Sequence, residues 1–450
     1  MSTVAPAAVS GAPRPLLRGR DAIAIVVGIV IGAGIFRTPP LVAQVTGDPG
    51  WTLAAWVAGG VISLIGALCY AELASTYPHA GGDYHFLTRA YGRNASFLYA
   101  WARATVINTG SIALLAFVFG DYMTRIVDLG AQSAALWAAL VVVMLTAVNI
   151  ASLSASARTQ NWLTVCEVAG LLLVIVAGVV ASPASGPATS WFASTPALGA
   201  AGLAMVFVLL TYGGWNEAAY LSAELRGGPR AVVSTLVASI AIITLLYVAV
   251  NLALLSGLGF GALAQSKAAP ADVVASAFGG VVAGILAGFV AVATITSINA
   301  TMLVGARTNY ALAGDWKALS LIARWNEARG VPTQAFLVQG ALALALVAFG
   351  AAQKDGFEAM VEFTAPVFWG FLTLVGVALL LLRRREPAIA RPFRVPLYPL
   401  TPLVFIAVCA YLCYSSIGYA MSRSAIHVSL GVMAVGIVAL VVTRLAGRGR

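Results

Sequence analysis

The chain has 450 residues, of which 60% are hydrophobic and only 9% are charged. A soluble globular domain carries about 25% charged residues, so this composition excludes a soluble enzyme or binding module and predicts an integral membrane protein. Basic residues exceed acidic ones by 26 to 16, but they cluster in short loops between apolar runs, where they set orientation in a membrane. Nucleic acid is therefore not an expected partner.

The chain is expected to begin with a disordered cytoplasmic tail, residues 1–20, which is rich in Ala and Pro and contains no cleavable signal. Twelve apolar runs follow, each close to the roughly 20 residues that a helix needs to cross a bilayer. Residues 446–450 form a second cytoplasmic tail. The predicted spans are 21–46, 51–77, 96–127, 133–153, 160–182, 198–225, 231–257, 277–312, 333–353, 358–382, 399–421 and 425–445.

Basic residues divide unevenly between the loops that these spans define. With the N-terminus inside, most of the 26 Lys and Arg residues fall on the cytoplasmic side. The outer side receives Arg37, Arg125, Lys267, Lys354 and Arg423. Positive charge is retained on the cytoplasmic side of a membrane, so we expect a multi-pass protein of the cell inner (plasma) membrane with both termini in the cytoplasm.

The first span is crowded with glycine between Gly28 and Phe36, where it reads Gly-Ile-Val-Ile-Gly-Ala-Gly-Ile-Phe. Each glycine costs about 0.5–1 kcal/mol of helix stability relative to alanine, and backbone groups opened within lipid must face a cavity or a ligand. The stretch is therefore either a close helix–helix contact or a broken helix. A break would expose the amides of Ala33, Gly34 and Ile35 at a new helix N-terminus, which attracts a carboxylate.

A matching interruption occurs in the sixth span, at Tyr212-Gly213-Gly214-Trp215. Unwound backbone would free carbonyls that suit an ammonium group, and the two aromatic side chains can close over a small ligand. Amides that bind a carboxylate opposite carbonyls that bind an amine describe an α-amino acid. Interruptions at matching positions of two halves indicate an inverted-repeat transporter, here with five-helix repeats over 21–182 and 198–382 and peripheral helices over 399–445.

Further motifs accompany the two interruptions. They are Ala71-Glu72-Leu73-Ala74-Ser75-Thr76-Tyr77-Pro78 with Gly81-Gly82-Asp83-Tyr84, Glu224-Leu225, Arg307-Thr308-Asn309-Tyr310-Ala311 with Gly314-Asp315, and Arg391-Pro392-Phe393-Arg394-Val395-Pro396-Leu397-Tyr398-Pro399. With the two interruptions, they make the chain resemble the amino acid–polyamine–organocation (APC) superfamily, and bacterial L-amino-acid permeases most closely. The resemblance runs from residue 28 to residue 399.

The resemblance implies an all-α, leucine-transporter-type fold with twelve transmembrane helices, a 5+5 inverted repeat and alternating access. It places the carboxylate-binding amides on the first interruption, the amine-binding carbonyls on Val30, Leu210 and Gly213, and a polar third-helix residue on Asn108. The aromatic gate of the sixth helix falls on Tyr212 or Trp215. The expected substrate-binding residues are Val30, Ile31, Gly32, Ala33, Gly34, Ile35, Asn108, Leu210, Tyr212, Gly213, Gly214 and Trp215.

Two carboxylates and an arginine are candidates for coupling or gating. Glu167 stands where many family members carry a lysine. It either binds a proton or a cation, as ionisable groups inside membranes often do, or forms a structural ion pair with Arg103. Glu217, just past the second interruption, is either a gate or proton-linked carboxylate or the partner of a neighbouring arginine.

Other polar residues favour structural roles. Glu72 is expected to cap its helix or to pair with loop arginines. A polar stripe on the eighth span, Thr294, Thr296, Ser297 and Asn299, either completes a cation site against the first span or bonds neighbouring helices. The spacing of the Cys and His residues indicates no metal site, disulfide or cofactor; these residues are Cys69, Cys166, Cys409, Cys413, His79, His85 and His427.

The predicted function is secondary active transport of neutral L-amino acids across the plasma membrane, by proton-coupled symport or by exchange, with sodium coupling also open. An acidic substrate becomes possible if Arg103 borders the pocket, and a cationic one would need Glu217 to face it. The alternatives are an amino-acid/polyamine antiporter for a charged substrate and a transporter-like nutrient sensor. An enzyme is not expected, because no nucleophile, base or metal ligands converge at membrane depth. The oligomeric state stays open.

Overall fold

The computed structural model describes residues 19–79, 81–151, 157–181, 190–216, 228–315, 324, 326, 331–421 and 425–448. Within these ranges every regular element is helical, apart from one isolated β-bridge between Asn326 and Val331. The predicted all-α class is therefore confirmed for the described residues.

The helices follow one another along the chain with short connections. The first half contains α1 (Gly19–Val30), the 3₁₀-helix η1 (Ala33–Phe36), α2 (Thr38–Thr46), α3 (Pro49–Thr76), α4 (Asp83–Tyr91), α5 (Arg93–Ala102), the π-helix η2 (Arg103–Ile107), α6 (Asn108–Ile126), α7 (Ser133–Ile150), α8 (Ala157–Val180) and α9 (Leu198–Thr211). The second half contains α11 (Gly228–Leu258), α12 (Phe260–Gln265), α13 (Ala269–Phe278), α14 (Gly280–Asp315), α15 (Thr333–Ala351), α16 (Gly356–Arg385), α17 (Leu400–Met421) and α18 (Ala425–Arg448).

Nine membrane-spanning candidates are present among the described residues: α3, α5 continued through η2 into α6, α7, α11, α14, α15, α16, α17 and α18. They coincide with nine of the predicted spans. The other three predicted spans coincide with α1 to α2, with α8 and with α9. Here the helices are interrupted, or their described apolar parts are shorter, as in Glu167–Val180 and Leu198–Thr211.

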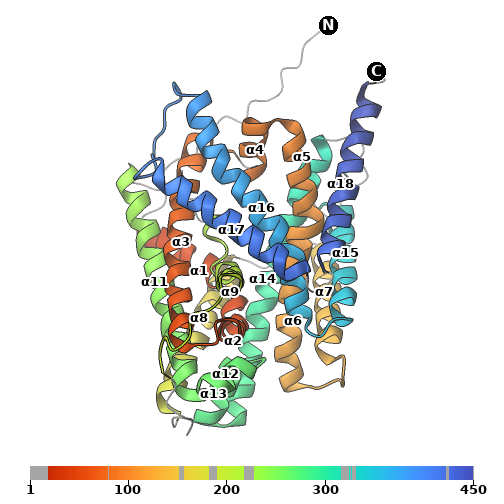
Figure 1. Ribbon diagram of the computed structural model, residues 1–450. Coiled ribbons are helices and arrows are strands. Elements are labelled where there is room, and N and C mark those ends of the chain that lie inside the picture. The colour runs from red at the N-terminus through yellow and green to blue at the C-terminus, as the bar shows by residue number, and fades with distance from the viewer. Residues whose placement is uncertain are drawn as a thin grey trace.

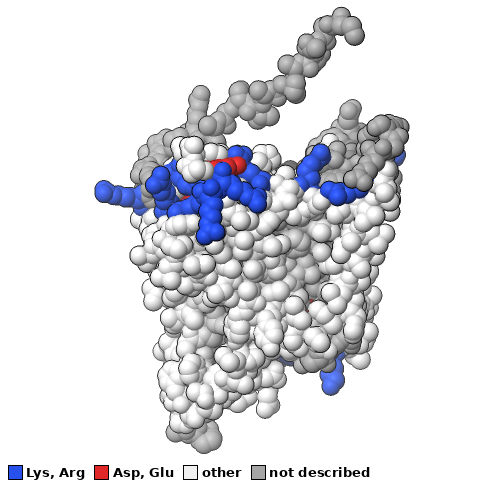
Figure 2. All heavy atoms as spheres, turned by 45° about the horizontal axis from the view of Figure 1, so that its top comes forward, with Lys and Arg blue, Asp and Glu red and all other residues white. Residues whose placement is uncertain are grey.

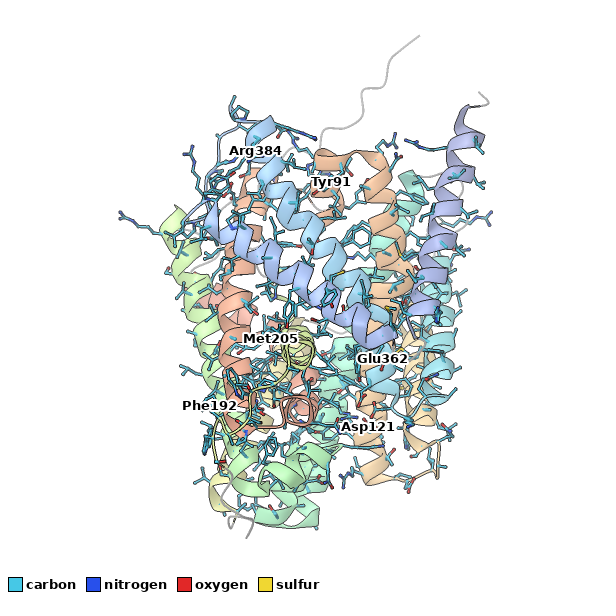
Figure 3. All side chains as sticks on the ribbon, in the orientation of Figure 1. Tyr91, Asp121, Phe192, Met205, Glu362 and Arg384 are labelled. Carbon is cyan, nitrogen blue, oxygen red and sulfur yellow. The ribbon has the colours of Figure 1, made fainter. Side chains whose placement is uncertain are left out.

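Charge separates the two ends of the bundle. Lys and Arg gather at the end that carries α4 and the end of α18, and the sides in view are nearly free of charged side chains (Figures 1 and 2). Arg384 and Tyr91 lie at this end, whereas Asp121 and Phe192 lie toward the other (Figure 3). We call the end with Arg384 the basic end. An apolar belt around a bundle of long helices is the arrangement that a bilayer requires.

Buried ion pairs hold α3 to α16 and the loop after it at the basic end. Glu72, which is 1% exposed, accepts hydrogen bonds from Arg383 Nε at 2.6 Å and from the Val395 amide at 2.7 Å. Arg391 Nε lies 3.4 Å from the same carboxylate. The predicted pairing of Glu72 with loop arginines is thus present.

A second buried ion cluster lies toward the opposite end. Arg37 directly follows η1 and is only 2% exposed. Its Nε lies 3.0 Å from Asp121 of α6, and its Nη2 lies 2.5 Å from Asp355, the N-cap residue of α16. The guanidinium also lies over the ring of Phe357, 5.4 Å from its centroid. Three segments that are distant in sequence are therefore held together by one arginine.

Candidate functional site

Both predicted interruptions are present as breaks in helical structure. α1 ends at Val30, and Ile31 and Gly32 are non-helical before η1 begins; Gly32 has an extended backbone with φ −126° and ψ −176°. α9 ends at Thr211, and a turn over residues 212–214 follows before helical geometry resumes. Gly214 has φ +101°, a left-handed conformation that glycine adopts without steric cost.

The two breaks lie against each other. A Cβ atom added to Gly34 would lie 3.4 Å from the Thr211 backbone, so there is room at this contact for a methyl group but not for a large side chain. The hydroxyls of Thr211 and Thr38 are 2.9 Å apart. On α11, the Tyr247 hydroxyl donates to the carbonyl oxygens of Val30, at 3.1 Å, and Thr211, at 3.4 Å. Tyr247 thus joins the two broken segments, a role that no sequence pattern indicated.

Two cavities flank the breaks and share part of their walls. One, of about 240 Å³, is lined at the first break by Gly28, Ile31 and Gly32. The other, of about 220 Å³, is lined at the second break by Leu210, Gly213 and Gly214. Both are lined by Arg103, Asn108 and Thr301. We call the two cavities together the central chamber. Each is below the roughly 300–1,000 Å³ of pockets for drug-sized ligands, so a small molecule is the fitting occupant.

A local departure from α-helical geometry shapes the shared wall. Residues Arg103–Ile107 form the π-helix η2 between α5 and α6. Such π-bulges inside α-helices frequently occur at functional sites. The first residue of this turn and Asn108, which follows it, are both chamber residues.

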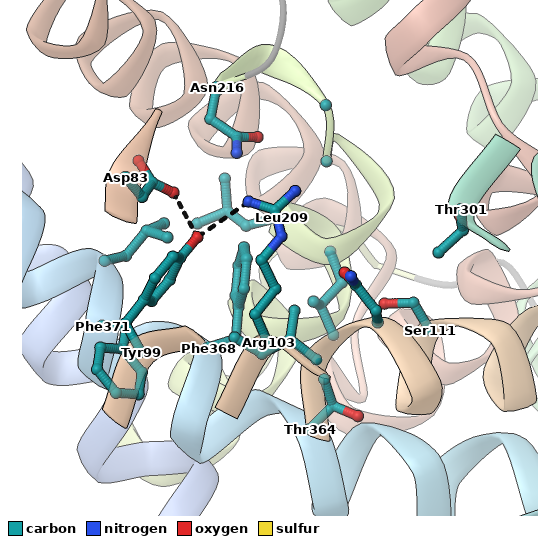
Figure 4. Close-up of a pocket in the computed structure, with 16 residues that line it drawn as sticks. Asp83, Tyr99, Arg103, Ser111, Leu209, Asn216, Thr301, Thr364, Phe368 and Phe371 are labelled. Atoms are coloured by element: carbon teal, nitrogen blue, oxygen red, sulfur yellow. Dashed lines mark hydrogen bonds between the residues drawn. The ribbon is translucent and has the colours of Figure 1, made fainter. Parts of the chain in front are cut away.

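A chain of hydrogen bonds runs along the chamber at the second break. Tyr99 donates from its hydroxyl to Asp83 Oδ2 at 2.9 Å, and Arg103 Nη1 donates to the Tyr99 oxygen at 3.2 Å. Figure 4 shows these side chains together, with Asn216 extending toward Arg103 from the opposite side. Asp83 is 3% exposed, so its carboxylate is buried. Its negative charge partly compensates the positive charge of Arg103, to which it is linked through the Tyr99 hydroxyl.

Some of the predicted site residues line the chamber, and others belong to the breaks without lining it. Those lining it are Ile31, Gly32, Arg103, Asn108, Glu167, Leu210, Gly213 and Gly214. The described residues that line the two cavities do not include four members of the first break, Val30, Ala33, Gly34 and Ile35. Glu217 falls outside the described residues.

The two predicted aromatic gate residues pack into the protein core. The Tyr212 hydroxyl donates to the Trp56 carbonyl at 2.9 Å, and its ring lies 5.0 Å from that of Tyr247. The Trp215 ring meets Tyr70 edge to face at 5.3 Å. In this structure neither ring lines the chamber.

Glu167 and Arg103 share the cavity at the first break without pairing. Glu167 is 7% exposed and lies with Ser297 on this cavity. Within the described part of the chain, no ion pair joins Glu167 to Arg103, which instead donates to Tyr99. Of the stripe on α14, Ser297 reaches the chamber, whereas Asn299 accepts from Asn149 of α7 at 2.7 Å. The stripe therefore bonds a neighbouring helix through Asn299, whereas a cation site at Ser297 stays a prediction.

Sequence reasoning missed several chamber residues. They are Asp83, Tyr99, Ser111, Asn216, Thr301 and Thr364. Asp83 stands in a motif that contributed only to the resemblance, and Asn216 directly follows the second interruption, so these two stretches were the available signal. The others carry no local signal, because polar residues that bond neighbouring helices have the same spacing.

The fold and the chamber define a multi-pass membrane protein with a cavity of small-molecule size between two interrupted helices. Residues 17–441 match the family described as Amino acid permease. The chain therefore belongs to this family, within the APC superfamily, and its family is one of transporters, not of enzymes.

Curated relatives agree with this assignment. The chain is 28% identical to the b(0,+)-type amino acid transporter 1 of Mus musculus over 406 residues, which cover 88% of this chain and 81% of that protein. It is 26% identical to the cystine/glutamate transporter of Homo sapiens over 404 residues, covering 88% and 78%. It is 28% identical to the large neutral amino acids transporter small subunit 2 of Rattus norvegicus over 417 residues, covering 88% and 75%.

Proposed function

We propose that this chain is a secondary active permease of the plasma membrane that moves neutral α-amino acids by alternating access. In this proposal twelve spans form two inverted five-helix repeats, residues 21–182 and 198–382, followed by peripheral helices over 399–445. Both tails, residues 1–20 and 446–450, are cytoplasmic. The observation that carries the proposal is the meeting of two broken helices at a chamber of small-ligand size.

The backbone at the breaks suits the two charged groups that all α-amino acids share. The amides at the start of η1, which directly follow the chamber residue Gly32, are proposed to bind the carboxylate, because a helix N-terminus combines N–H donors with a positive dipole end. The carbonyls of Leu210 and Gly213, both at the chamber, are proposed to bind the ammonium group. The Val30 carbonyl would join them once it is released from Tyr247.

Coupling to an ion is proposed at Glu167. Its carboxyl group lies at the chamber beside the first break, together with the hydroxyl-bearing Ser297. An intramembrane carboxyl group without a cationic partner is a candidate for a proton or cation site. We propose proton-linked uptake, with exchange as the mode when no gradient is present.

Arg103 on the chamber wall supports a second candidate function, an antiporter for an acidic amino acid. A guanidinium at the ligand site favours a substrate that carries a negative charge. A transporter-like sensor would share the same chamber but would move nothing.

Counterflow in proteoliposomes tests the proposal. Purified full-length protein is reconstituted, the vesicles are preloaded with one unlabelled amino acid, and uptake of the same amino acid in labelled form is followed. A permease shows saturable uptake that internal substrate accelerates. A channel shows no such acceleration, and a sensor shows binding without flux, so either outcome contradicts the proposal.

Imposed gradients then separate the coupling modes. Uptake into empty vesicles is measured with an inward proton gradient, with an inward sodium gradient and with neither. Accumulation only with the proton gradient supports proton-linked uptake. Accumulation only with sodium overturns the choice of ion but leaves the permease assignment intact.

A further inference from the structure

We propose that the chamber selects amino acids whose side chain ends in a carboxamide, the glutamine and asparagine class. This inference rests on the proposed function, because it assigns the α-ammonium and α-carboxylate groups to the two breaks. The remaining wall of the chamber is then available to the substrate's side chain.

That wall carries several polar side chains. Arg103, Asn108 and Thr301 line both cavities, and Ser111 and Asn216 line the one at the second break. In Figure 4 these polar groups approach from separate elements, Ser111 on α6 and Thr301 on α14. A permease for aliphatic amino acids gains nothing from such a wall, because each polar group loses its water when an apolar side chain covers it.

Asn108 carries the argument furthest. The residue is 8% exposed, it lines both cavities, and its Nδ2 has no hydrogen-bond partner among the described residues. A buried donor without a partner costs free energy, and native proteins rarely leave one unmet. A carbonyl oxygen on the substrate's side chain would supply the missing acceptor, whereas an aliphatic side chain would leave the amide unmet.

Charge on the wall decides between a carboxamide and a carboxylate. Arg103 is already linked to the buried Asp83 through the Tyr99 hydroxyl, and Glu167 adds another acidic group at the chamber. A second carboxylate on the substrate would bring negative charge toward both acids, and an uncompensated buried charge is strongly unfavourable. A carboxamide offers the same carbonyl acceptor without the charge, and its NH₂ group can donate to the hydroxyls of Ser111 and Thr301.

The apolar part of the wall fits the methylenes of such a substrate. Phe368 and Phe371 of α16 line the cavity at the second break together with Leu372. Figure 4 shows both phenylalanine rings on the side of the cavity where Tyr99 lies. The short apolar stem of glutamine can pack here while its terminal amide reaches the polar residues.

Competition in proteoliposomes tests this inference. Vesicles containing the full chain and internal glutamine take up labelled glutamine in the presence of unlabelled glutamine, asparagine, glutamate, leucine or lysine. We expect glutamine and asparagine to inhibit at concentrations at least about tenfold lower than the others, because a site built to bond a polar group discriminates against analogues that lack it. Stronger inhibition by leucine, glutamate or lysine overturns the inference.

Two variants assign the selectivity to the wall. Asn108→Leu removes the unpartnered amide at similar size, and we expect it to lose at least about tenfold in preference for glutamine over leucine. Thr301→Val removes a chamber hydroxyl that also bonds the Ser297 carbonyl at 2.9 Å. Its matched control is Thr373→Val, since the Thr373 hydroxyl makes the same bond within its helix, to the Trp369 carbonyl at 2.8 Å, but does not line the chamber.

Melting temperatures with and without glutamine keep the test independent of transport. We expect Asn108→Leu and Thr301→Val to melt close to the parent without ligand but to lose most of the glutamine-induced rise, while Thr373→Val retains that rise. An equal loss in Thr373→Val, or an undiminished rise in Asn108→Leu, overturns the inference. Exchange of leucine without exchange of glutamine contradicts this inference alone, whereas the absence of all amino-acid exchange contradicts the proposed function.

Discussion

Glu167 is a buried carboxylic acid on the wall of the central chamber. It is 7% exposed, it lines the cavity at the first break, and within the described residues it has no cationic partner. Burying an ionised carboxylate without a partner is costly, so a purely structural role explains this residue poorly. Binding a proton or a cation explains it better, because either one neutralises the charge.

Replacing this carboxyl group tests the coupling role directly. We expect Glu167→Gln, which keeps the size but cannot ionise, to abolish accumulation driven by an ion gradient while sparing exchange in vesicles without a gradient. Glu167→Asp, which keeps the carboxyl group, serves as the control and should retain part of the accumulation. Unchanged accumulation by the Gln variant would return Glu167 to a structural role.

The two helix breaks depend on a close approach of their backbones at Gly34 and Thr211. A Cβ on Gly34 would lie 3.4 Å from Thr211, which is close contact but not overlap. We therefore expect Gly34→Ala to be tolerated and Gly34→Leu to push the breaks apart and to abolish substrate-induced thermal stabilisation. Gly284→Leu on α14, where nothing lies within 4 Å of the added Cβ, is the matched control. Substrate stabilisation that survives Gly34→Leu would show that the first break is only a packing contact.

Arg37 links three segments of the bundle, so we expect its removal to lower the stability of the whole fold. Deleting one partner of a buried ion cluster leaves uncompensated charge and costs about 3–5 kcal/mol. We expect this loss in the unfolding free energy of Arg37→Met, because Asp121 and Asp355 would then lose the guanidinium that both contact. The triple variant Arg37→Met/Asp121→Asn/Asp355→Asn should recover part of the loss. A triple variant that is no more stable than Arg37→Met would contradict the electrostatic explanation.

The elements differ in how much of their structure the sequence could predict. The two breaks were predictable, because glycines at matching places in two spans are costly unless they serve a site. The π-turn at Arg103–Ile107 was not, since its residues read as ordinary helix. The rings of Tyr212 and Trp215 were expected at the ligand but pack against Tyr247 and Tyr70, because aromatic side chains bury large areas equally well in a core. The link from Arg103 through Tyr99 to Asp83 depends on tertiary geometry, which no local pattern specifies.

The stability of the whole molecule should depend on the protonation of one histidine at the basic end, His85. His85 lies on α4, outside the spans, and its ring stacks on His79 at 4.3 Å between centroids. Burial, followed by the neighbouring His79 and Arg89, lowers the pKa of His85 below its ordinary value of 6.5. The unfolded chain therefore binds a proton at this position more readily than the folded protein does.

The sign of the resulting pH dependence follows from this order of affinities. The contribution of His85 to stability is full above pH 6.5 and is lost as the pH falls from 6.5 through the lower folded pKa. We expect the melting temperature of the parent to fall between pH 7.5 and pH 5.5, and the fall to be smaller in His85→Gln. His427→Gln is the control, because His427 is exposed on α18, away from this pair. Equal falls in the parent and in His85→Gln would show that protonation of the stacked pair does not oppose folding.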